Sequence, residues 1–402
     1  MVANTIGAGV YTTSGFTLHD LGSREGVILV WLLASLLALT GAVSFGALAR
    51  AIPKSGGEYL YLSRLIHPAA GFIAGWVSMI AAFAGAEAYA AITFKAYIDL
   101  PAGLETLIAL GLILLLSVLQ GVLVKSGTLI QNLTVLAKGL FMLVFIIFGL
   151  AVWQTPTDAP FKQPESLWLW PVSLMWVSLS FTGFNAAIYV AEECKNPERD
   201  IPRALVIGTV ITAFLYLLIN IVFVYSAPLS QLSGTSDIAL VSAQALGGKV
   251  LRQAVQALVL LSLFTLISGI AVAGPRVVVK MGEDGYLPPF TLKQAAFIQC
   301  ALAMTMTLSS SLLEQLNYLS LVLSLTSAGA VAAVFKLPVE KRPHIAFPLF
   351  YILGSLLGAA ASVYRDPKGG LAALATIVSG GLVYALFFSK PGSRSTSQET
   401  GN

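Results

Sequence analysis

The sequence predicts an all-α polytopic membrane protein with about 12 transmembrane helices. Of its 402 residues, 57% are hydrophobic and only 10% are charged, whereas soluble proteins carry about 25% charged residues. Apolar segments of spanning length, about 20 residues, recur from one end of the chain to the other. The net charge of +4 is distributed over short connections and indicates no nucleic-acid partner.

One transmembrane domain is expected over residues 1–389, because the connections are too short to hold a soluble domain. The longest connections are Gln154–Ser166 and Ser226–Val250, and the polar tail Lys390–Asn402 is expected to be disordered. The predicted spans are Val2–Leu18, Val27–Ala49, Gly71–Tyr97, Thr106–Val124, Leu129–Val152, Leu167–Ala191, Ala204–Val224, Val255–Val279, Ala295–Leu312, Asn317–Leu337, Ala346–Val363 and Leu371–Phe388.

The distribution of lysine and arginine predicts the orientation. Of the 23 basic residues, 15 fall in one set of alternate loops and 7 in the other. Because basic loops stay in the cytoplasm, both termini are expected there, in the cell membrane. The remaining basic residue, Lys138, lies inside the fifth segment.

The first segment contains the stretch TIGAGVYTTSG, residues Thr5–Gly15, in which Gly7-Ala8-Gly9 predicts a helix break. A glycine inside a helix costs about 1 kcal/mol relative to alanine. A broken membrane helix is tolerated where it is buried in protein or lines a cavity, and its bare amides can bind an anion such as a carboxylate. Close helix packing through small residues is the alternative interpretation.

A second break is expected in the sixth segment, SLSFTGFNAAIYVAEE, residues Ser178–Glu193. Small and polar residues interrupt the apolar run at Ser180, Thr182, Gly183 and Asn185. The first and sixth segments would each open a five-helix half, over about 1–153 and 167–337, followed by extra helices at 346–389. Because five is odd, the halves would be inverted, and paired breaks in inverted halves indicate a transporter site.

Four motifs resemble those of the amino acid–polyamine–organocation (APC) superfamily of amino acid permeases. Besides TIGAGVYTTSG, they are PKSGGEYLYLSR (Pro53–Arg64), AEECKNPERDIPRAL (Ala191–Leu205) and GPRVVVKMGEDGYLP (Gly274–Pro288), in the family's order. The resemblance implies the LeuT-like fold of the bacterial leucine transporter: a 5+5 inverted repeat with broken helices 1 and 6, plus two extra C-terminal helices. It also implies alternating access for amino acids.

The sequence departs from this family at its start. Only Met1–Ile6 precede Gly7, which is about 9 Å of helix and too short to reach the cytoplasmic face from the bilayer centre. We expect that the natural chain carries further N-terminal residues, which intact-mass analysis would detect. The alternative is a protein that lacks part of its inner gate.

The resemblance implies how a zwitterion would bind. The substrate carboxylate would meet free amides at Gly7, Ala8 and Gly9, and the ammonium would meet free carbonyls at Ile6 in the first segment. Opposite half-helix dipoles would sort the two charges without a charged side chain. From the sixth segment, the free carbonyls would be those of Ser180, Phe181 and Gly183, with Thr182 and Asn185 completing the substrate-binding set.

Lys138 lies ten residues into the fifth segment from Thr128, roughly 15 Å along a helix. A central lysine costs about 2.5–3.5 kcal/mol, so a role is expected. The family resemblance makes it a surrogate for the sodium ion of sodium-coupled relatives, with Ser268 as a neighbour. It would tie the first helix to the scaffold and carry coupling protons, or it would be a static amine that caps helix-one carbonyls.

Glu87 is the second charge predicted inside a span. It could read a substrate amine, relay protons, pair with a lysine or face a water-filled outer vestibule. Phe181 and Phe184 are candidates for an outer gate, with core packing as the alternative. Asn185 and Leu179 stand where the arginine–agmatine exchangers carry a proton-sensing glutamate and a gating tryptophan, which disfavours a polyamine or arginine substrate.

The predicted function is secondary active transport of neutral amino acids, by proton symport or exchange and without sodium. Its partners would be the amino acid, the lipid bilayer and protons. A non-transporting amino acid sensor and a polyamine or cationic amino acid exchanger remain alternatives. An enzyme is disfavoured because the chain lacks the clustered His, Asp or Cys that a membrane-embedded catalytic centre needs, and no cofactor or metal is predicted.

Overall fold

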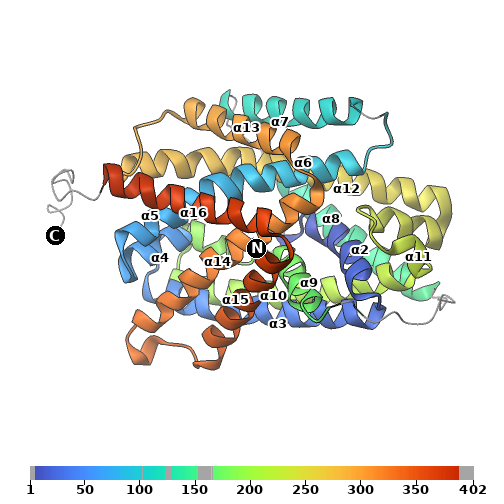
Figure 1. Ribbon diagram of the computed structural model, residues 1–402, viewed down its shortest axis with the longest axis horizontal. Coiled ribbons are helices and arrows are strands. Elements are labelled where there is room, and N and C mark those ends of the chain that lie inside the picture. Colours follow the sequence, from blue (N-terminus) through green and yellow to red (C-terminus); the bar gives the residue numbers. More distant parts are fainter. Residues whose placement is uncertain (1–4, 102, 123–127, 153–163, 165, 389–402) are drawn as a thin grey trace.

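The computed structural model describes residues 5–101, 103–122, 128–152, 164 and 166–388, and every element in these ranges is helical (Figure 1). Residues 5–152 contain α2 (Gly9–Leu21), α3 (Arg24–Ala51), α4 (Gly57–Leu65), α5 (Pro68–Val77), the π-helix η1 (Ser78–Gly85), α6 (Ala86–Ala96), α7 (Leu104–Val122) and α8 (Thr128–Ala151). Residues 166–388 contain α9 (Leu169–Leu179), the 3₁₀ helix η2 (Ala186–Glu193), α10 (Pro197–Tyr225), α11 (Leu229–Leu232), α12 (Ile238–Glu283), α13 (Leu292–Ser309), α14 (Leu312–Ala332), η3 (Ala333–Lys336), η4 (Val339–Lys341), α15 (Ala346–Arg365) and α16 (Pro367–Phe387).

Each predicted apolar segment overlaps at least one of these helices. Within the described ranges, seven helical stretches are long and apolar enough to cross a membrane, and three shorter apolar helices accompany them. The protein is therefore a multi-pass membrane protein, as its composition predicted.

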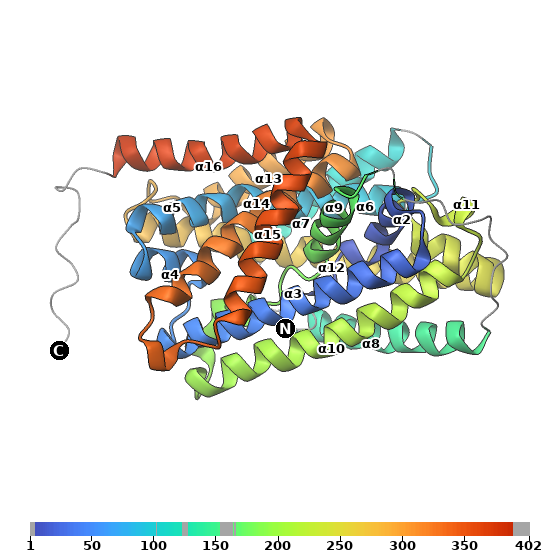
Figure 2. The same ribbon diagram turned by 60° about the horizontal axis from the view of Figure 1, so that its bottom comes forward.

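Helix α3 shows why these sequences form long helices that are apolar on both faces. Ser23 caps its start by accepting a hydrogen bond from the Gly26 amide at 3.0 Å. One face packs along α10, and the two helices run side by side (Figure 2). The opposite face leaves Leu29, Leu32 and Leu36 between 43% and 46% exposed. That spacing forms one stripe of a helix, and in a bilayer the stripe would contact lipid.

Two connections differ from the sequence expectation. The predicted connection Ser226–Val250 is largely helical, because it holds α11 and the first part of α12. Helix α12 is bent at Gly247 and Gly248, whose backbone angles are non-helical. Most of Gln154–Ser166 and the tail Lys390–Asn402 lie outside the described residues.

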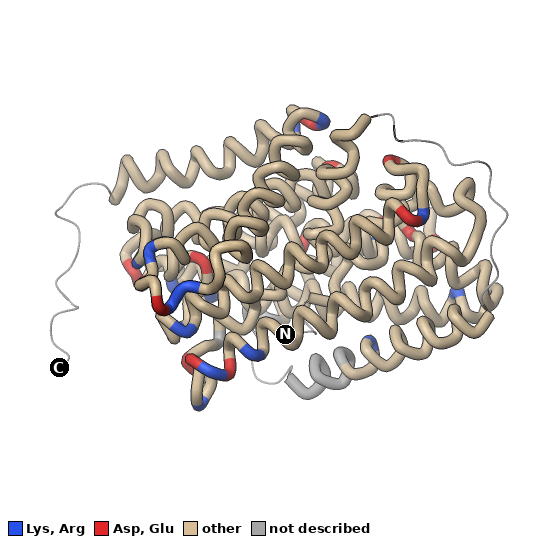
Figure 3. The backbone as a smooth tube through the Cα atoms, turned by 90° about the horizontal axis from the view of Figure 1, so that it is seen from below, with Lys and Arg blue, Asp and Glu red and all other residues tan. Residues whose placement is uncertain are grey.

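Most charged residues lie near the ends of the long helices (Figure 3). Helix α4 lies at one end of the molecule and α11 at the other (Figure 1). We call these the α4 end and the α11 end. With the apolar helices between them crossing a bilayer, the two ends would face opposite aqueous compartments.

Candidate functional site

The two interrupted segments lie against each other in the middle of the bundle. Ile6, Gly7 and Ala8 are non-helical and α2 begins at Gly9, while turns at 180–185 separate α9 from η2. A Cβ atom on Gly9 would lie 2.5 Å from Ser180 Oγ. Only glycine permits this close approach. Gly9, which the sequence predicted as part of a helix break, therefore also allows the two segments to come together.

The turn after α9 depends on Gly183, whose φ of 99° lies in the left-handed region. The turn places the Phe184 amide on the Phe181 carbonyl and the Ala186 amide on the Gly183 carbonyl, each at 3.0 Å. The expectation that both carbonyls are free was therefore wrong. In the described part of the chain, the carbonyls of Ile6 and Ser180 have no hydrogen-bond donor.

Tyr216 of α10, which the sequence reasoning missed, holds the first segment in place. Its hydroxyl donates to the Thr5 carbonyl at 2.7 Å and faces the Gly7 amide. This leaves the amides of Ala8 and Gly9 for an anion. A polar pair four residues apart in an apolar helix, Tyr216 and Asn220, was the available signal.

Aromatic packing fixes the two predicted gate residues. Phe181 is 1% exposed, and its ring packs on Trp31 and Tyr216 with centroids 6.1 and 5.1 Å away. Phe184 packs edge-on against Phe45 at 5.7 Å. Both phenylalanines also border the central cavity, so their core packing is observed and their role as a gate stays a prediction.

A cavity of about 1730 Å³ begins at the two breaks and extends to the α4 end. Its volume exceeds the roughly 300–1,000 Å³ of a typical small-ligand pocket, because it includes a vestibule. All the residues predicted to hold the substrate line it, namely Ile6, Gly7, Ala8, Gly9, Ser180, Phe181, Thr182, Gly183 and Asn185. The basic residues Lys54, Arg64, Arg276 and Lys280 line its far end.

Lys138 reaches this cavity and is 4% exposed. Its Nζ donates to the Ser262 carbonyl of α12 at 3.2 Å. This bond joins α8 to α12, whereas the sequence predicted a bond to the first segment. Ser268, the predicted neighbour, lies further along α12 and outside the cavity lining.

Glu87 of α6 does not face a water-filled vestibule, so that alternative was wrong. Its side chain is fully buried and is not part of the cavity lining. Glu87 Oε2 accepts a hydrogen bond from Gln299 Nε2 at 2.7 Å. The Gln299 side chain fits against Gly274, where a Cβ atom would overlap it. Glu87 therefore joins α6 to α13, away from the substrate position.

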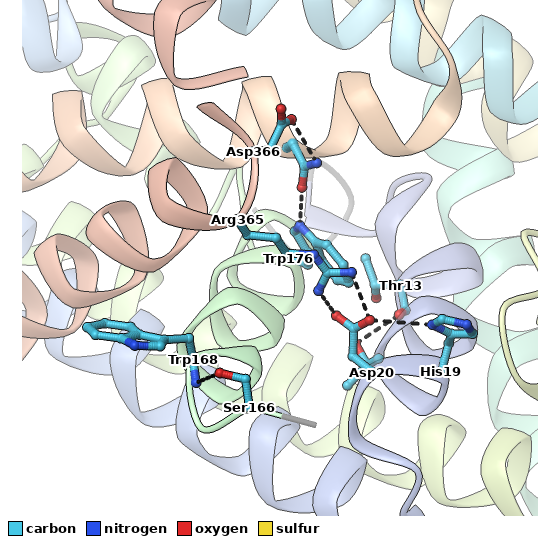
Figure 4. A network of polar contacts seen from close by, with 10 residues as sticks. Thr13, His19, Asp20, Ser166, Trp168, Trp176, Arg365 and Asp366 are labelled. Carbon is cyan, nitrogen blue, oxygen red and sulfur yellow. Dashed lines mark hydrogen bonds and ion pairs between the residues drawn. The ribbon is translucent and has the colours of Figure 1, made fainter. Parts of the chain in front are cut away.

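At the α11 end, a polar network joins α2 to the turn between α15 and α16 (Figure 4). Asp20 accepts from both terminal nitrogens of Arg365, with Nη2 at 2.9 Å from Oδ1. The guanidinium stacks over Trp176 with 4.9 Å to the ring centroid. Trp176 Nε1 donates to Asn317 Oδ1 at 2.6 Å, and Asn317 Nδ2 donates to Asp366 Oδ2 at 3.2 Å.

We call these five residues, Asp20, Trp176, Asn317, Arg365 and Asp366, the clamp. None of them belongs to the cavity lining. The cavity thus opens toward the α4 end, and the clamp lies on the side that the cavity does not reach. Sequence reasoning missed the clamp, because its charges lie at helix ends that resemble ordinary solvated turns.

A bundle of apolar helices around a cavity bordered by two interrupted helices defines a membrane transport protein. The chain belongs to the amino acid permease family, whose model matches residues 1–400. This confirms the resemblance to the APC superfamily and excludes the enzyme interpretation, since the family consists of transporters.

Three relatives of this chain are named for different amino acid substrates. The chain is 26% identical to large neutral amino acids transporter small subunit 2 of Oryctolagus cuniculus, over 96% of this chain and 78% of the relative. It is 27% identical to the cystine/glutamate transporter of Pongo abelii, over 96% and 83%. It is 26% identical to the serine/threonine exchanger SteT of Bacillus subtilis (strain 168), over 72% and 67%.

Proposed function

We propose that the protein carries neutral amino acids across the membrane by alternating access, as a proton symporter or an exchanger that needs no sodium. The observation that carries this proposal is the meeting of two helix breaks at one cavity. The names of two relatives, a large neutral amino acids transporter subunit and a serine/threonine exchanger, support the substrate class.

The substrate carboxylate would bind at the amides of Ala8 and Gly9, where α2 begins. The positive end of a helix dipole and unpaired amides favour an anion there. The ammonium would bind at the carbonyls of Ile6 and Ser180. Ala8, Thr182 and Ala186 leave space for the substrate side chain, and no Asp, Glu, Lys or Arg occurs among Phe181–Ala191 to select an acidic or basic one.

The proposed architecture has twelve spans, arranged as two inverted five-helix repeats, over about 1–153 and 167–337, followed by the extra helices at 346–389. The breaks in the first and sixth segments support this arrangement. The excess of basic residues supports an orientation in which the α4 end and both termini would lie in the cytoplasm. The clamp would then close the outer side, and transport would require it to open.

Lys138 supports sodium independence. Its amine borders the cavity beside the Ser262 carbonyl, and a second cation there would meet a like charge at short range. Lys138→Ala is expected to lower exchange at least tenfold, because the variant removes the hydrogen bond that joins α8 to α12 beside the cavity. Uptake and pH dependence equal to those of the wild type would refute a role for this residue.

The proposal is tested by reconstituting the protein into liposomes loaded with an unlabelled neutral amino acid and measuring uptake of the labelled form. We expect exchange flux with sodium absent and no increase when sodium is added. A thermal-shift screen over the twenty amino acids would identify the substrate beforehand. Binding without flux would refute transport and favour an amino acid sensor.

A further inference from the structure

Glu58 is a buried acidic side chain that borders the cavity without a basic partner. It lies at the start of α4, in the connection that follows α3, and is 7% exposed. It lines the cavity together with Asn185 and Ser327. In the described part of the chain, no lysine or arginine forms an ion pair with it.

One oxygen of Glu58 joins three separate elements. Glu58 Oε1 accepts a hydrogen bond from Ser327 Oγ of α14 at 2.6 Å and from Asn185 Nδ2 at 3.2 Å. Asn185 ends the non-helical stretch that follows α9 and directly precedes η2. The carboxyl group therefore joins three parts of the chain, namely the start of α4, the broken sixth segment and α14.

Among the described residues, the titratable groups that face Glu58 are tyrosines. Tyr189 of η2 and Tyr351 of α15 both interact with it electrostatically, and Tyr61 of α4 adjoins Tyr189. Phenols are neutral near pH 7, so they offer no positive charge to hold a carboxylate. Burial raises the pKa of Glu58 to about 7, and the Ser327 hydroxyl opposes that shift.

We propose that Glu58 is a proton-binding site of the transport cycle, with its proton exchanged through the cytoplasmic vestibule. This inference rests on the proposed function and adds the residue that couples protons to transport. A carboxylate only accepts hydrogen bonds, whereas a carboxylic acid also donates one. A proton on Glu58 therefore changes the link among α4, the broken segment and α14, in which Asn185 is part of the proposed substrate set.

The geometry distinguishes Glu58 from the other buried acid. Glu87 is also buried, but it contacts Gln299 and lies outside the cavity lining. Glu58 has both a route for a proton, through the vestibule, and a hydrogen bond to the broken segment. A conformation that buries Glu58 binds a proton more tightly than one that hydrates it. Acid on the cytoplasmic side therefore favours the arrangement seen here, and raising the pH through about 7 weakens it.

The test compares wild type and Glu58→Gln in proteoliposomes, using uptake driven by an inward proton gradient and exchange at equal pH. Wild type is expected to accumulate labelled substrate when a proton gradient is imposed. Glu58→Gln keeps the acceptor oxygen for Asn185 and Ser327, so it should retain exchange and lose accumulation. Ser327→Ala removes a donor that stabilises the charged carboxylate, so it should shift the midpoint of the pH profile upward.

Glu283→Gln is the matched control. Glu283 lines the mouth of the same cavity, but its side chain is 63% exposed and lies 3.5 Å from Lys280. It should accumulate substrate as the wild type does. Wild-type exchange without gradient-driven accumulation, or accumulation that survives in Glu58→Gln, would overturn the inference and leave the proposed function intact. The absence of any wild-type flux would overturn both.

Discussion

Replacing Asp20 by asparagine removes the negative charge of the clamp while keeping the size of the side chain. Asp20 has only 4% of its side chain exposed, and Arg365 has 30%. The change leaves the guanidinium stacked on Trp176 without its anionic partner. If the clamp closes the outer side of the transporter, Asp20→Asn should shift the population toward outward-open conformations.

The size of the shift follows from the burial of the pair. Removing one partner of a buried ion pair costs about 3–5 kcal/mol. Because Arg365 remains partly exposed, the lower end of that range applies. A change of about 3 kcal/mol in the closing equilibrium alters the population ratio by roughly 100-fold.

Labelling by a membrane-impermeant thiol reagent can measure this population. A cysteine at Phe16, whose ring packs edge-on against Trp176 at 6.4 Å, would report outer opening once Cys194 and Cys300 are replaced by serine. Asp20→Asn should raise the labelling rate by at least tenfold, because conformations in which the reagent cannot reach this cysteine would no longer dominate.

Asp99→Asn is the matched control. It breaks the Asp99–Arg252 pair, whose nitrogen and oxygen lie 2.8 Å apart, but Asp99 is 65% exposed there. An exposed pair contributes only about 0–1 kcal/mol, so labelling should change little. Equal labelling in the two variants, or none in Asp20→Asn beyond the parent, would refute the reasoning.

Three further predictions concern the cavity and its supports. Gly9→Ala should weaken substrate binding at least tenfold in a thermal-shift titration, because its Cβ would lie 2.5 Å from Ser180 Oγ; Gly139→Ala, which meets nothing within 4 Å, should bind normally. Tyr216→Phe removes the hydroxyl that binds the first segment and should cost about 1–2 kcal/mol, or roughly tenfold in the apparent dissociation constant; unchanged affinity would contradict this support. Because the pKa of Glu58 is raised to about 7, the wild type should lose up to about 3 kcal/mol of stability relative to Glu58→Gln as the pH rises from 5 to 8. Equal changes in the melting temperatures of the two proteins across that pH range would contradict the assignment.

The sequence was sufficient to predict an all-helical, multi-pass membrane protein and the substrate-set residues that line the cavity. Apolar runs of spanning length predict helices independently of their neighbours, because lipid leaves the backbone no other partner. Gly7 and Gly9 predicted the interruption that precedes α2, and Gly9 also permits the contact with Ser180. The position of Lys138 inside a span also predicted its burial.

The contacts that hold the site together could not be predicted in this way. Arg365 and Asp20 are 345 positions apart, and Glu58 and Asn185 are 127 apart. Hydrophobic periodicity determines which face of a helix is buried but does not determine which distant side chain meets it. The hydrogen bonds of the Phe181 and Gly183 carbonyls depend on turn geometry, which a count of small residues does not give.

The most direct test of the central claim is a competition assay on neutral amino acid exchange in proteoliposomes, because the claim is that two helix breaks bind both charges of a zwitterion. The free amino acid should compete fully with labelled substrate. Its methyl ester, which lacks the carboxylate for Ala8 and Gly9, and its N-acetyl derivative, which lacks the ammonium for Ile6 and Ser180, should each compete at least 100-fold more weakly. Equal competition by all three compounds would contradict the account.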